Sequence, residues 1–233
     1  MKGKLYLIPS PLGGEDPREV LPEPVLERAC SLQTFVVEEV RTARRYLSKA
    51  GLKGHIDELR FFTLNEHTAP SEVEELLKLF DEGDVGLITE AGLPAVADPG
   101  ALLVALCHSR GIRVVPLVGP SSLMLALMAS GLDGQSFAFG GYLPAKTEER
   151  RKAIRAVEKR SAELHQSQIF IETPYRNDSL MKDLAEVCHP ATRICIAADI
   201  TLPSETILTR TAAEWRKALP AIGKRPCVFL LLA

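Results

Sequence analysis

The sequence has few of the residue patterns that hold metal ions or disulfides. Its five cysteines are odd in number, and no two of them have C-x-x-C spacing. They are Cys30, Cys107, Cys188, Cys195 and Cys227. The five histidines form no H-E-x-x-H pattern. We therefore expect no zinc site, no disulfide framework and no metal-dependent catalysis, and we predict that the cysteines are small buried hydrophobic residues.

Long apolar runs are also missing. No stretch approaches the roughly 18 apolar residues of a membrane helix. The apolar run at the N-terminus extends only from Leu5 to Ile8 before Pro9, which is too short for the core of a signal peptide. These absences predict a cytoplasmic protein. The net charge of −2 and the pI near 6.2 exclude a generally basic surface, so any contact with RNA has to come from local patches.

Three common ligand-binding patterns are absent as well. The chain has no G-x-G-x-x-G, no G-x-x-x-x-G-K-[ST] and no G-x-S-x-G, which disfavours a usual nicotinamide site, a usual ATP site and a serine hydrolase. Aromatic residues make up 6% of the chain. The candidates for stacking on RNA bases are Tyr142 and Tyr175.

What the sequence does contain is an alternation of strands and helices. Strands are expected at 4–8, 35–37, 85–88, 112–115, 137–139, 169–172, 193–198 and 228–232. Helices are expected at 21–31, 41–50, 71–82, 99–110, 121–130 and 147–160. The pattern predicts an α/β protein with two α/β domains. The first, 1–116, has a mostly parallel sheet, and the second, 117–233, has a mixed sheet.

Two of these helices carry more specific predictions. In the helix at 71–82, Ser71 and Glu74 have the spacing of a capping box. The helix at 121–130, SSLMLALMAS, is apolar on all faces and is predicted to be buried.

Turn-rich stretches follow three strands of the first domain. They are SPLGG (10–14), EEVR (38–41) and TEAGLPAVADPG (89–100), and a fourth, VGPSS (118–122), opens the apolar helix. Carboxyl ends of parallel strands meet at one edge of a sheet, so we expect these loops to converge there, where α/β proteins bind ligands. Backbone N–H groups in the loops could hold a polar ligand group, and glycines would let it approach closely.

The order of these motifs resembles a known family. LYLIPSPLGG, EEVRTARRYL, GLITEAGLPAVADPG, IRVVPLVGPSSLMLALMASGL, FAFGGYLPAK and FIETPYRN are similar to the tetrapyrrole-methylase-fold S-adenosylmethionine methyltransferases. They look most like the RsmI-like branch, which 2′-O-methylates a cytidine of small-subunit ribosomal RNA. The resemblance runs from about Leu5 to Leu232. It implies a homodimer and a cofactor, S-adenosylmethionine, in the cleft between the two domains.

The resemblance also implies cofactor-binding positions. By position they are Pro9, Leu12, Gly13, Glu90, Ala91, Gly92, Leu93, Pro94, Ala97, Asp98, Ser121, Ser122, Ile171, Thr173 and Ala198. The loop at 89–100 would hold the methionine part and ribose, and the last three residues would bracket the adenine. The chain departs from the family pattern mainly on the substrate side. Glu38-Glu39-Val40-Arg41 stands for Glu-Asp-Thr-Arg, and Leu202 stands for a lysine.

Methyl transfer to a ribose hydroxyl needs alignment of the reacting groups and benefits from a base. Catalytic candidates are Glu39, Lys146 and Glu172. For Lys146, phosphate binding and a solvated surface position are the alternatives. For Glu172 the alternative is a turn-capping carboxylate, and for Glu39 it is an ion pair within the domain.

Local basic patches provide candidate RNA contacts. The stretch 146–160 holds seven basic residues and three acidic ones. The candidates are Arg41, Arg45, Lys146, Arg150, Arg151 and Arg155. Phosphate contacts from such patches give salt-dependent affinity for RNA. The alternative is that this charged stretch is only the solvated face of a helix.

The function predicted from the sequence is therefore S-adenosylmethionine-dependent 2′-O-methylation of ribose in the RNA of the small ribosomal subunit. Two alternatives stay open. One is a small-molecule methylase of the same fold that acts on a tetrapyrrole. The other is a protein that binds the cofactor without catalysis.

Overall fold

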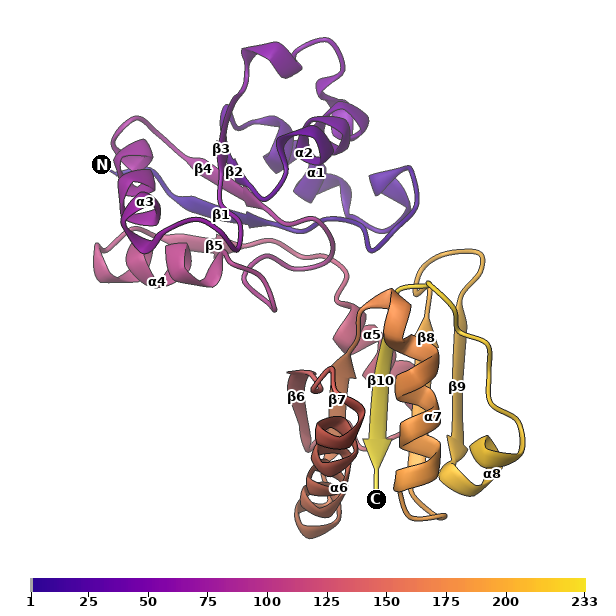
Figure 1. The fold of residues 1–233 in the computed structure, drawn as a ribbon. Helices are drawn as coiled ribbons and strands as arrows, with labels where there is room; N and C mark the ends of the chain where they lie inside the picture. Colours follow the sequence, from indigo (N-terminus) through magenta and orange to yellow (C-terminus); the bar gives the residue numbers. More distant parts are fainter. Residues whose placement is uncertain (1) are drawn as a thin grey trace. The chain divides into compact units, whose positions relative to one another are not determined.

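The computed structural model describes residues 2–233, and the chain divides into two compact units (Figure 1). The first unit ends at Ser121, and the second runs from Ser122 to Ala233. Each unit contains one five-stranded sheet and is described by itself.

The sheet of the first unit is wholly parallel. Its strands are β1 (Leu5–Ile8), β2 (Thr34–Val37), β3 (Arg60–Thr63), β4 (Val85–Ile88) and β5 (Val114–Pro116). They lie in the order β3-β2-β4-β1-β5. The predicted parallel sheet is confirmed. Strand β3 was not predicted, because it is an edge strand with exposed ends and has no continuous apolar run.

Helices cover both faces of this sheet. They are α1 (Glu23–Cys30), α2 (Val40–Leu47), α3 (Pro70–Glu75) and α4 (Ala101–Ser109), with the shorter turns η1 (Pro17–Glu19), η2 (Ser48–Leu52), η3 (Ile56–Glu58) and η4 (Leu76–Asp81). Alternate strand residues point to opposite faces. Phe35 therefore packs against residues of α1 and α2, and Val36 against residues of α3 and α4 on the opposite face.

The start of α3 differs from the prediction. The residue before the helix is Ala69, whose backbone N–H donates to the Glu72 carboxylate at 2.8 Å. Ser71 lies inside the helix, so the predicted capping pair of Ser71 and Glu74 is wrong. Pro70 explains the shift, because a proline is favoured in the first turn of a helix.

The second unit has a mixed sheet, as predicted. Its strands are β6 (Phe137–Tyr142), β7 (Ser167–Ile171), β8 (Arg193–Ala198), β9 (Thr206–Thr211) and β10 (Cys227–Leu232), in the order β6-β7-β10-β8-β9. Strands β6 and β7 are parallel, and the other neighbours are antiparallel. Strand β9 was not predicted, because its residues are only partly buried and largely polar.

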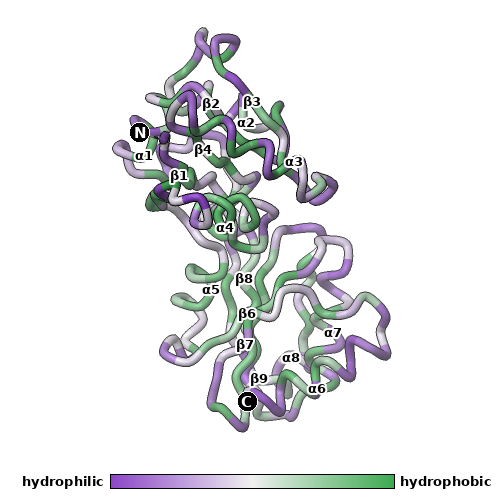
Figure 2. The backbone as a smooth tube through the Cα atoms, turned by 90° about the vertical axis from the view of Figure 1, so that its left-hand side faces the viewer, coloured by the Kyte–Doolittle hydropathy of each residue, from purple (hydrophilic) through white to green (hydrophobic). Residues whose placement is uncertain are grey.

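Helices α6 (Thr147–Leu164), α7 (Asn177–Val187) and α8 (Ala212–Lys217) pack on one face of this sheet around Trp215, and α5 (Ser122–Ser130) lies on the other. Helix α5 is apolar along its length (Figure 2). The prediction that it is buried is wrong for one side, since Met124 is 43% exposed and Met128 77%. A helix that lacks a polar face gives no sequence signal of which side faces solvent.

In residues 2–233, no helix is long and apolar enough to cross a membrane. Within the same residues no three His, Cys, Asp or Glu side chains are grouped so that they could hold a metal ion. The five cysteines are free thiols.

Candidate functional site

The candidate site of the first unit lies at the carboxyl ends of β2, β4 and β1, which are neighbours in the sheet. The loops that leave β1 and β4 are joined here. The Ser10 N–H donates to the Gly92 carbonyl at 2.9 Å, and the Gly92 N–H donates back at 3.0 Å. The predicted convergence of SPLGG, EEVR and TEAGLPAVADPG on one edge is confirmed.

The loop 89–100 is organised around Asp98. One carboxylate oxygen accepts the N–H groups of Ala95 (3.1 Å) and Gly100 (2.8 Å). The other accepts the hydroxyl of Thr89 at 2.7 Å. Ala95 and Ala97 have φ of 64° and 56°. Left-handed backbone at two alanines is strained, and strain of this kind is typical of functional loops.

The stretch 118–122 packs closely against the end of β1. A Cβ on Gly119 would lie 2.2 Å from the Cβ of Pro9, so only glycine fits. Gly92 has φ of 77°, and a Cβ there would contact Leu12 and the carbonyl of Pro120. The two glycines therefore bring three loops of this edge into direct contact.

Three carboxylates gather around Thr89, and we call them the rim acids: Glu38, Glu90 and Asp98. The Thr89 hydroxyl lies 3.4 Å from Glu38 and 2.7 Å from Asp98. The sequence analysis chose Glu39 and missed Glu38. Glu39 is exposed and accepts the Arg41 N–H at 2.8 Å, so it caps the start of α2. The local sequence does not distinguish two adjacent acids. The contacts of Glu38 with Thr89 and Asp98, in the loop that follows β4, distinguish it from Glu39.

The rim acids have shifted pKa values. Burial first, and then the hydrogen bond to Asp98 and the negative charges of Asp98 and Glu90, together raise the pKa of Glu38 to about 7. Burial alone would raise the pKa of Asp98, but hydrogen bonds from Glu38, Thr89 and two backbone N–H groups outweigh it and lower this pKa. Burial also raises the pKa of Glu90, against a hydrogen bond with Thr42. Below a pH of about 7, Glu38 and Asp98 thus share one proton, which resides on Glu38.

A pocket of about 200 Å³ opens beside these acids, on the face of the sheet that α1 and α2 cover. Its walls come from 10–15 and Pro17, from the α2 face and the residues that follow it, and from the end of β4. Four of the predicted site residues line it: Leu12, Gly13, Arg45 and Glu90.

In the second unit, three predicted residues meet at one edge of the sheet. Ile171 ends β7, Thr173 follows it, and Ala198 ends β8. Both strands are antiparallel to β10, so their carboxyl ends lie at the same edge. Ala198 is fully buried, so its side chain cannot face a ligand.

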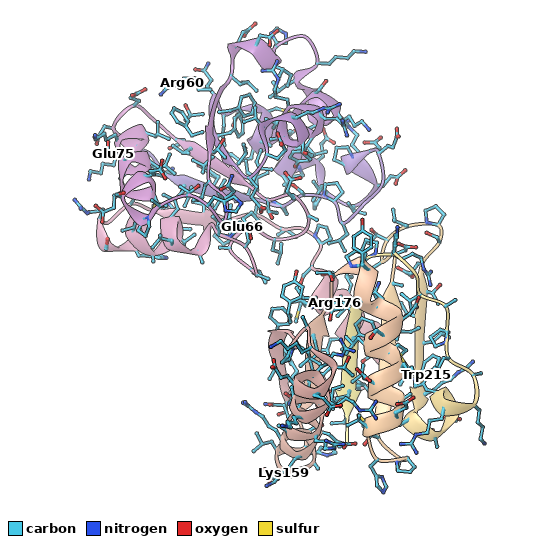
Figure 3. All side chains as sticks on the ribbon, viewed as in Figure 1. Arg60, Glu66, Glu75, Lys159, Arg176 and Trp215 are labelled. Carbon is cyan, nitrogen blue, oxygen red and sulfur yellow. The ribbon has the colours of Figure 1, made fainter. Side chains whose placement is uncertain are left out.

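Glu172 lies at this edge with its side chain buried. One carboxylate oxygen accepts the Thr173 N–H at 2.6 Å and the Arg176 Nε at 2.9 Å. The other oxygen, Oε2, is buried and has no hydrogen-bond partner among residues 2–233. The residue therefore combines the turn-capping role with an unpaired acceptor. Figure 3 shows Arg176 at the end of the unit opposite Lys159.

The loop after β8 belongs to the same edge and was not predicted beyond its family pattern. Asp199 and Thr201 have φ of 53° and 73°, and the Thr201 hydroxyl is buried without a partner within residues 2–233. Asp199 accepts the Ser204 hydroxyl at 2.9 Å and pairs with Arg225 at 3.6 Å. Dihedral angles of this kind leave no mark on composition, so sequence reasoning had no signal for them.

The basic stretch 146–160 is only partly a surface feature. Arg150 is 2% exposed and donates to Asp183 at 2.7 Å, to the Ala145 carbonyl and to Ser179. The prediction that Arg150 contacts RNA is therefore wrong, because this guanidinium joins α6 to α7 inside the unit. Arg151 is half-buried and also pairs with Asp183.

The remaining predicted cations are accessible. Lys146 has 82% of its side chain exposed and lies 3.5 Å from Glu149. Arg41, Arg45 and Arg155 are exposed. At 1.5 Å per residue, Arg155 is about 12 Å along the axis from the start of α6.

The fold of the two units is that of solved methyltransferase structures. The methyltransferase CobJ covers 99% of this chain with a TM-score of 0.65 and 18% identity, and it is itself covered over 94%. The cobalt precorrin-4 methyltransferase CbiF covers 98%, with a TM-score of 0.61, 16% identity and 94% of its own length. At these identities the likeness shows the fold.

Sequence comparisons give the family. The model of the tetrapyrrole (corrin/porphyrin) methylases matches residues 29–215. Proteins named ribosomal RNA small subunit methyltransferase I match from Escherichia coli (33% identity, 88% of this chain, 68% of theirs) and Neisseria meningitidis (32%, 96% and 72%). One from Pseudomonas aeruginosa is 33% identical over 91% of this chain and 71% of its own. The chain belongs to the tetrapyrrole methylase family, and it is a methyltransferase.

Proposed function

We propose that the enzyme transfers a methyl group from S-adenosylmethionine to the 2′-oxygen of a ribose, that of a cytidine, in the RNA of the small ribosomal subunit. The observation that carries the proposal is the similarity, over about nine-tenths of the chain, to relatives named for that RNA. The strained loop at the strand ends supports it, since ligands of α/β proteins bind at this edge.

The residues of the first unit suit this cofactor. A sulfonium is cationic, and the rim acids supply carboxylates beside the loop 89–100, none of which forms an ion pair with a lysine or arginine of residues 2–233. Gly92 and Gly119 have no side chain, so the loops at this edge of the sheet can pack closely together. We assign the turn of Ala91, Leu93 and Pro94, with Ala97 beside it, to the methionine part and ribose.

When bound, S-adenosylmethionine supplies a methyl carbon that a hydroxyl oxygen can take up while the bonding pair stays on sulfur. The protein has to accept the hydroxyl proton, and Glu38 is suited to this role. Its pKa of about 7 leaves a large ionised fraction at neutral pH while keeping high proton affinity. Asp98, held anionic by its own hydrogen bonds, would stabilise the proton once it is on Glu38.

Two of the three catalytic candidates from the sequence, Glu39 and Lys146, fit other roles better than that of the base. Glu39 caps α2, and Lys146 stands exposed at the start of α6, where it can bind a phosphate. Glu172 keeps an unpaired buried oxygen and remains a candidate base. RNA contacts are assigned to the exposed Arg41 and Arg155, in addition to Lys146.

Transfer of a labelled methyl group to small ribosomal subunits from a strain that lacks this gene tests the function. Label on a ribose 2′-oxygen is the expected result, and mapping it identifies the nucleotide. Label on a tetrapyrrole acceptor in its place would make the enzyme a small-molecule methylase. Cofactor binding in calorimetry without transfer to either acceptor would leave a protein that binds and does not catalyse.

The role of Glu38 has a separate test. With subunits as acceptor, the wild-type single-turnover rate should rise with pH through about 7, because the base must be ionised. Glu38→Gln should lower the rate by a factor of about 100 or more and abolish this rise. Glu172→Gln is the matched comparison. If it, and not Glu38→Gln, removes the pH dependence, the base is Glu172.

The enzyme is further proposed to be a homodimer, with the α5 face of the second sheet as its contact. Met128 is 77% exposed, and Phe137 and Phe139 are 40% and 37% exposed. The register of β6 with β7 places both phenylalanines on the α5 face. Apolar groups gathered on one face suit an isologous contact, in which the same surface meets itself.

Sedimentation of Met128→Glu tests this contact. The variant should be a monomer, whereas Leu164→Glu, a change at an exposed leucine on α6, should sediment as the wild type does. Identical sedimentation of the two variants would remove this face as the contact.

We further propose that the enzyme acts in the cytoplasm, because its proposed substrate is the RNA of the small ribosomal subunit.

A further inference from the structure

We infer that the pocket of the first unit receives the target nucleotide of the RNA, with Arg45 and Lys49 on its phosphates and Glu90 on the exocyclic amino group of its base. This inference rests on the proposed function and adds a substrate subsite to it. It also moves Glu90, which the family resemblance gave to the cofactor, to the substrate.

The size of the pocket suits one unit of a nucleic acid chain. Its volume is about 200 Å³, below the roughly 300–1,000 Å³ of sites for drug-sized ligands. Sequence-specific RNA recognition commonly takes a single unpaired base out of the strand and stacks it on an aromatic ring. Tyr46 provides such a ring. Its hydroxyl is fixed by a hydrogen bond to the Pro9 carbonyl at 3.1 Å, and Leu12 and Pro17 also line the pocket.

Two cations on one side of the pocket, Arg45 and Lys49, suit a phosphodiester. Thr42, Arg45, Tyr46 and Lys49 line it from one face of α2 and its continuation, at the i, i+3, i+4 and i+7 spacing of that face. Arg45 is exposed and has no ion pair among residues 2–233, and Lys49 lies 3.5 Å from Glu15, a side chain that is 96% exposed. An exposed pair of this kind is weak, so a phosphate can replace Glu15.

The base-reading group is Glu90. It lines the pocket and hydrogen-bonds with Thr42. A carboxylate accepts hydrogen bonds and, when ionised, donates none. It therefore favours a base with an exocyclic amino group on its Watson–Crick edge, which cytosine, adenine and guanine have, over uracil, which bears a carbonyl oxygen where cytosine has its amino group.

Binding of single nucleotides tests the subsite without catalysis. Cytidine 5′-monophosphate and uridine 5′-monophosphate are titrated into the protein and followed by NMR. The first should shift resonances of Thr42 and Glu90 and bind about tenfold more tightly than the second, within the factor that one base contact provides. Glu90→Gln should reduce this preference to about twofold or less, since an amide can serve either base.

Double variants test the phosphate contacts in the full reaction. Arg45→Ala with Lys49→Ala should raise KM for small ribosomal subunits at least tenfold. It should reduce the slope of log affinity against log salt by about 1.4, since each contact with single-stranded RNA adds about 0.7. Arg110→Ala with Arg113→Ala is the matched control. It removes the same charge from exposed positions beside the opposite, amino-terminal edge of the sheet, and should change neither quantity.

The outcomes separate the subsite from the function. Transfer of methyl to ribosomal RNA with equal KM for the two double variants, or equal binding of the two nucleotides by the wild type, would overturn the subsite alone. Absence of transfer by the wild type overturns the proposed function, and the nucleotide titration still decides whether the pocket binds an amino-bearing base.

Discussion

The shared proton of Glu38 and Asp98 makes the stability of the first unit depend on pH in a predictable way. The pKa of Glu38 rises from its ordinary value of 4.5 to about 7 on folding. The folded state therefore keeps a proton that the unfolded state releases, and stability falls as pH rises from below 4.5 through about 7. The lowered pKa of Asp98 acts in the opposite sense, but only below its ordinary value of 3.8, outside this range.

Glu38→Gln should remove this loss of stability. The glutamine amide donates to Asp98 at every pH, as protonated Glu38 does only below about pH 7. A difference of one in pKa corresponds to about 1.36 kcal/mol. The rise from 4.5 to about 7 can therefore lower the free energy of unfolding by at most about 3.4 kcal/mol. Because Glu38 is only half-buried, solvent screening reduces the expected value to about 1–2 kcal/mol.

Amide hydrogen exchange at β2 and β4 measures the stability of this unit, and Trp215 fluorescence follows the other. Between pH 5 and pH 8.5, wild-type β2 and β4 should lose about 1–2 kcal/mol relative to Glu38→Gln, while unfolding reported by Trp215 should not differ. Other groups titrate in both proteins and cancel in the comparison. A wild-type–variant difference that stays constant over this range would refute a shared proton, and so would one that favours the wild type at high pH.

Two further predictions concern single side chains. Arg150→Ala leaves Asp183 buried without its main partner and should destabilise the second unit by about 3–5 kcal/mol in urea unfolding followed by Trp215 fluorescence; an effect no greater than that of Arg151→Ala would contradict the buried position. Gly119→Ala would place a Cβ 2.2 Å from a proline at the end of β1, so we expect a loss of about 1–3 kcal/mol in the first unit and cofactor affinity at least tenfold weaker in calorimetry. Gly134→Ala, where the added Cβ meets nothing within 4 Å, should leave cofactor affinity unchanged.

Local patterns determined the main elements of both units. Continuous apolar runs such as 85–88 and 194–198 are buried in strands β4 and β8, because a strand covered on both faces has to be apolar there. The alternation with helices then required parallel connections in the first unit. That in turn brought the turn-rich stretches to one edge of the sheet, where the structure has them.

The tertiary structure decided which polar side chains lie in the site. Glu38 and Glu39 are chemically alike in the sequence, yet one meets Asp98 across neighbouring strands and the other caps a helix. Arg150 belongs to a basic run, but Asp183, 33 residues away, draws it into the interior. Burial, shared protons and ion pairs depend on contacts between distant segments. The sequence by itself therefore determined the sheets apart from their edge strands β3 and β9, and it determined the edge at which the loops meet. Packing determined the charge and protonation of the groups there.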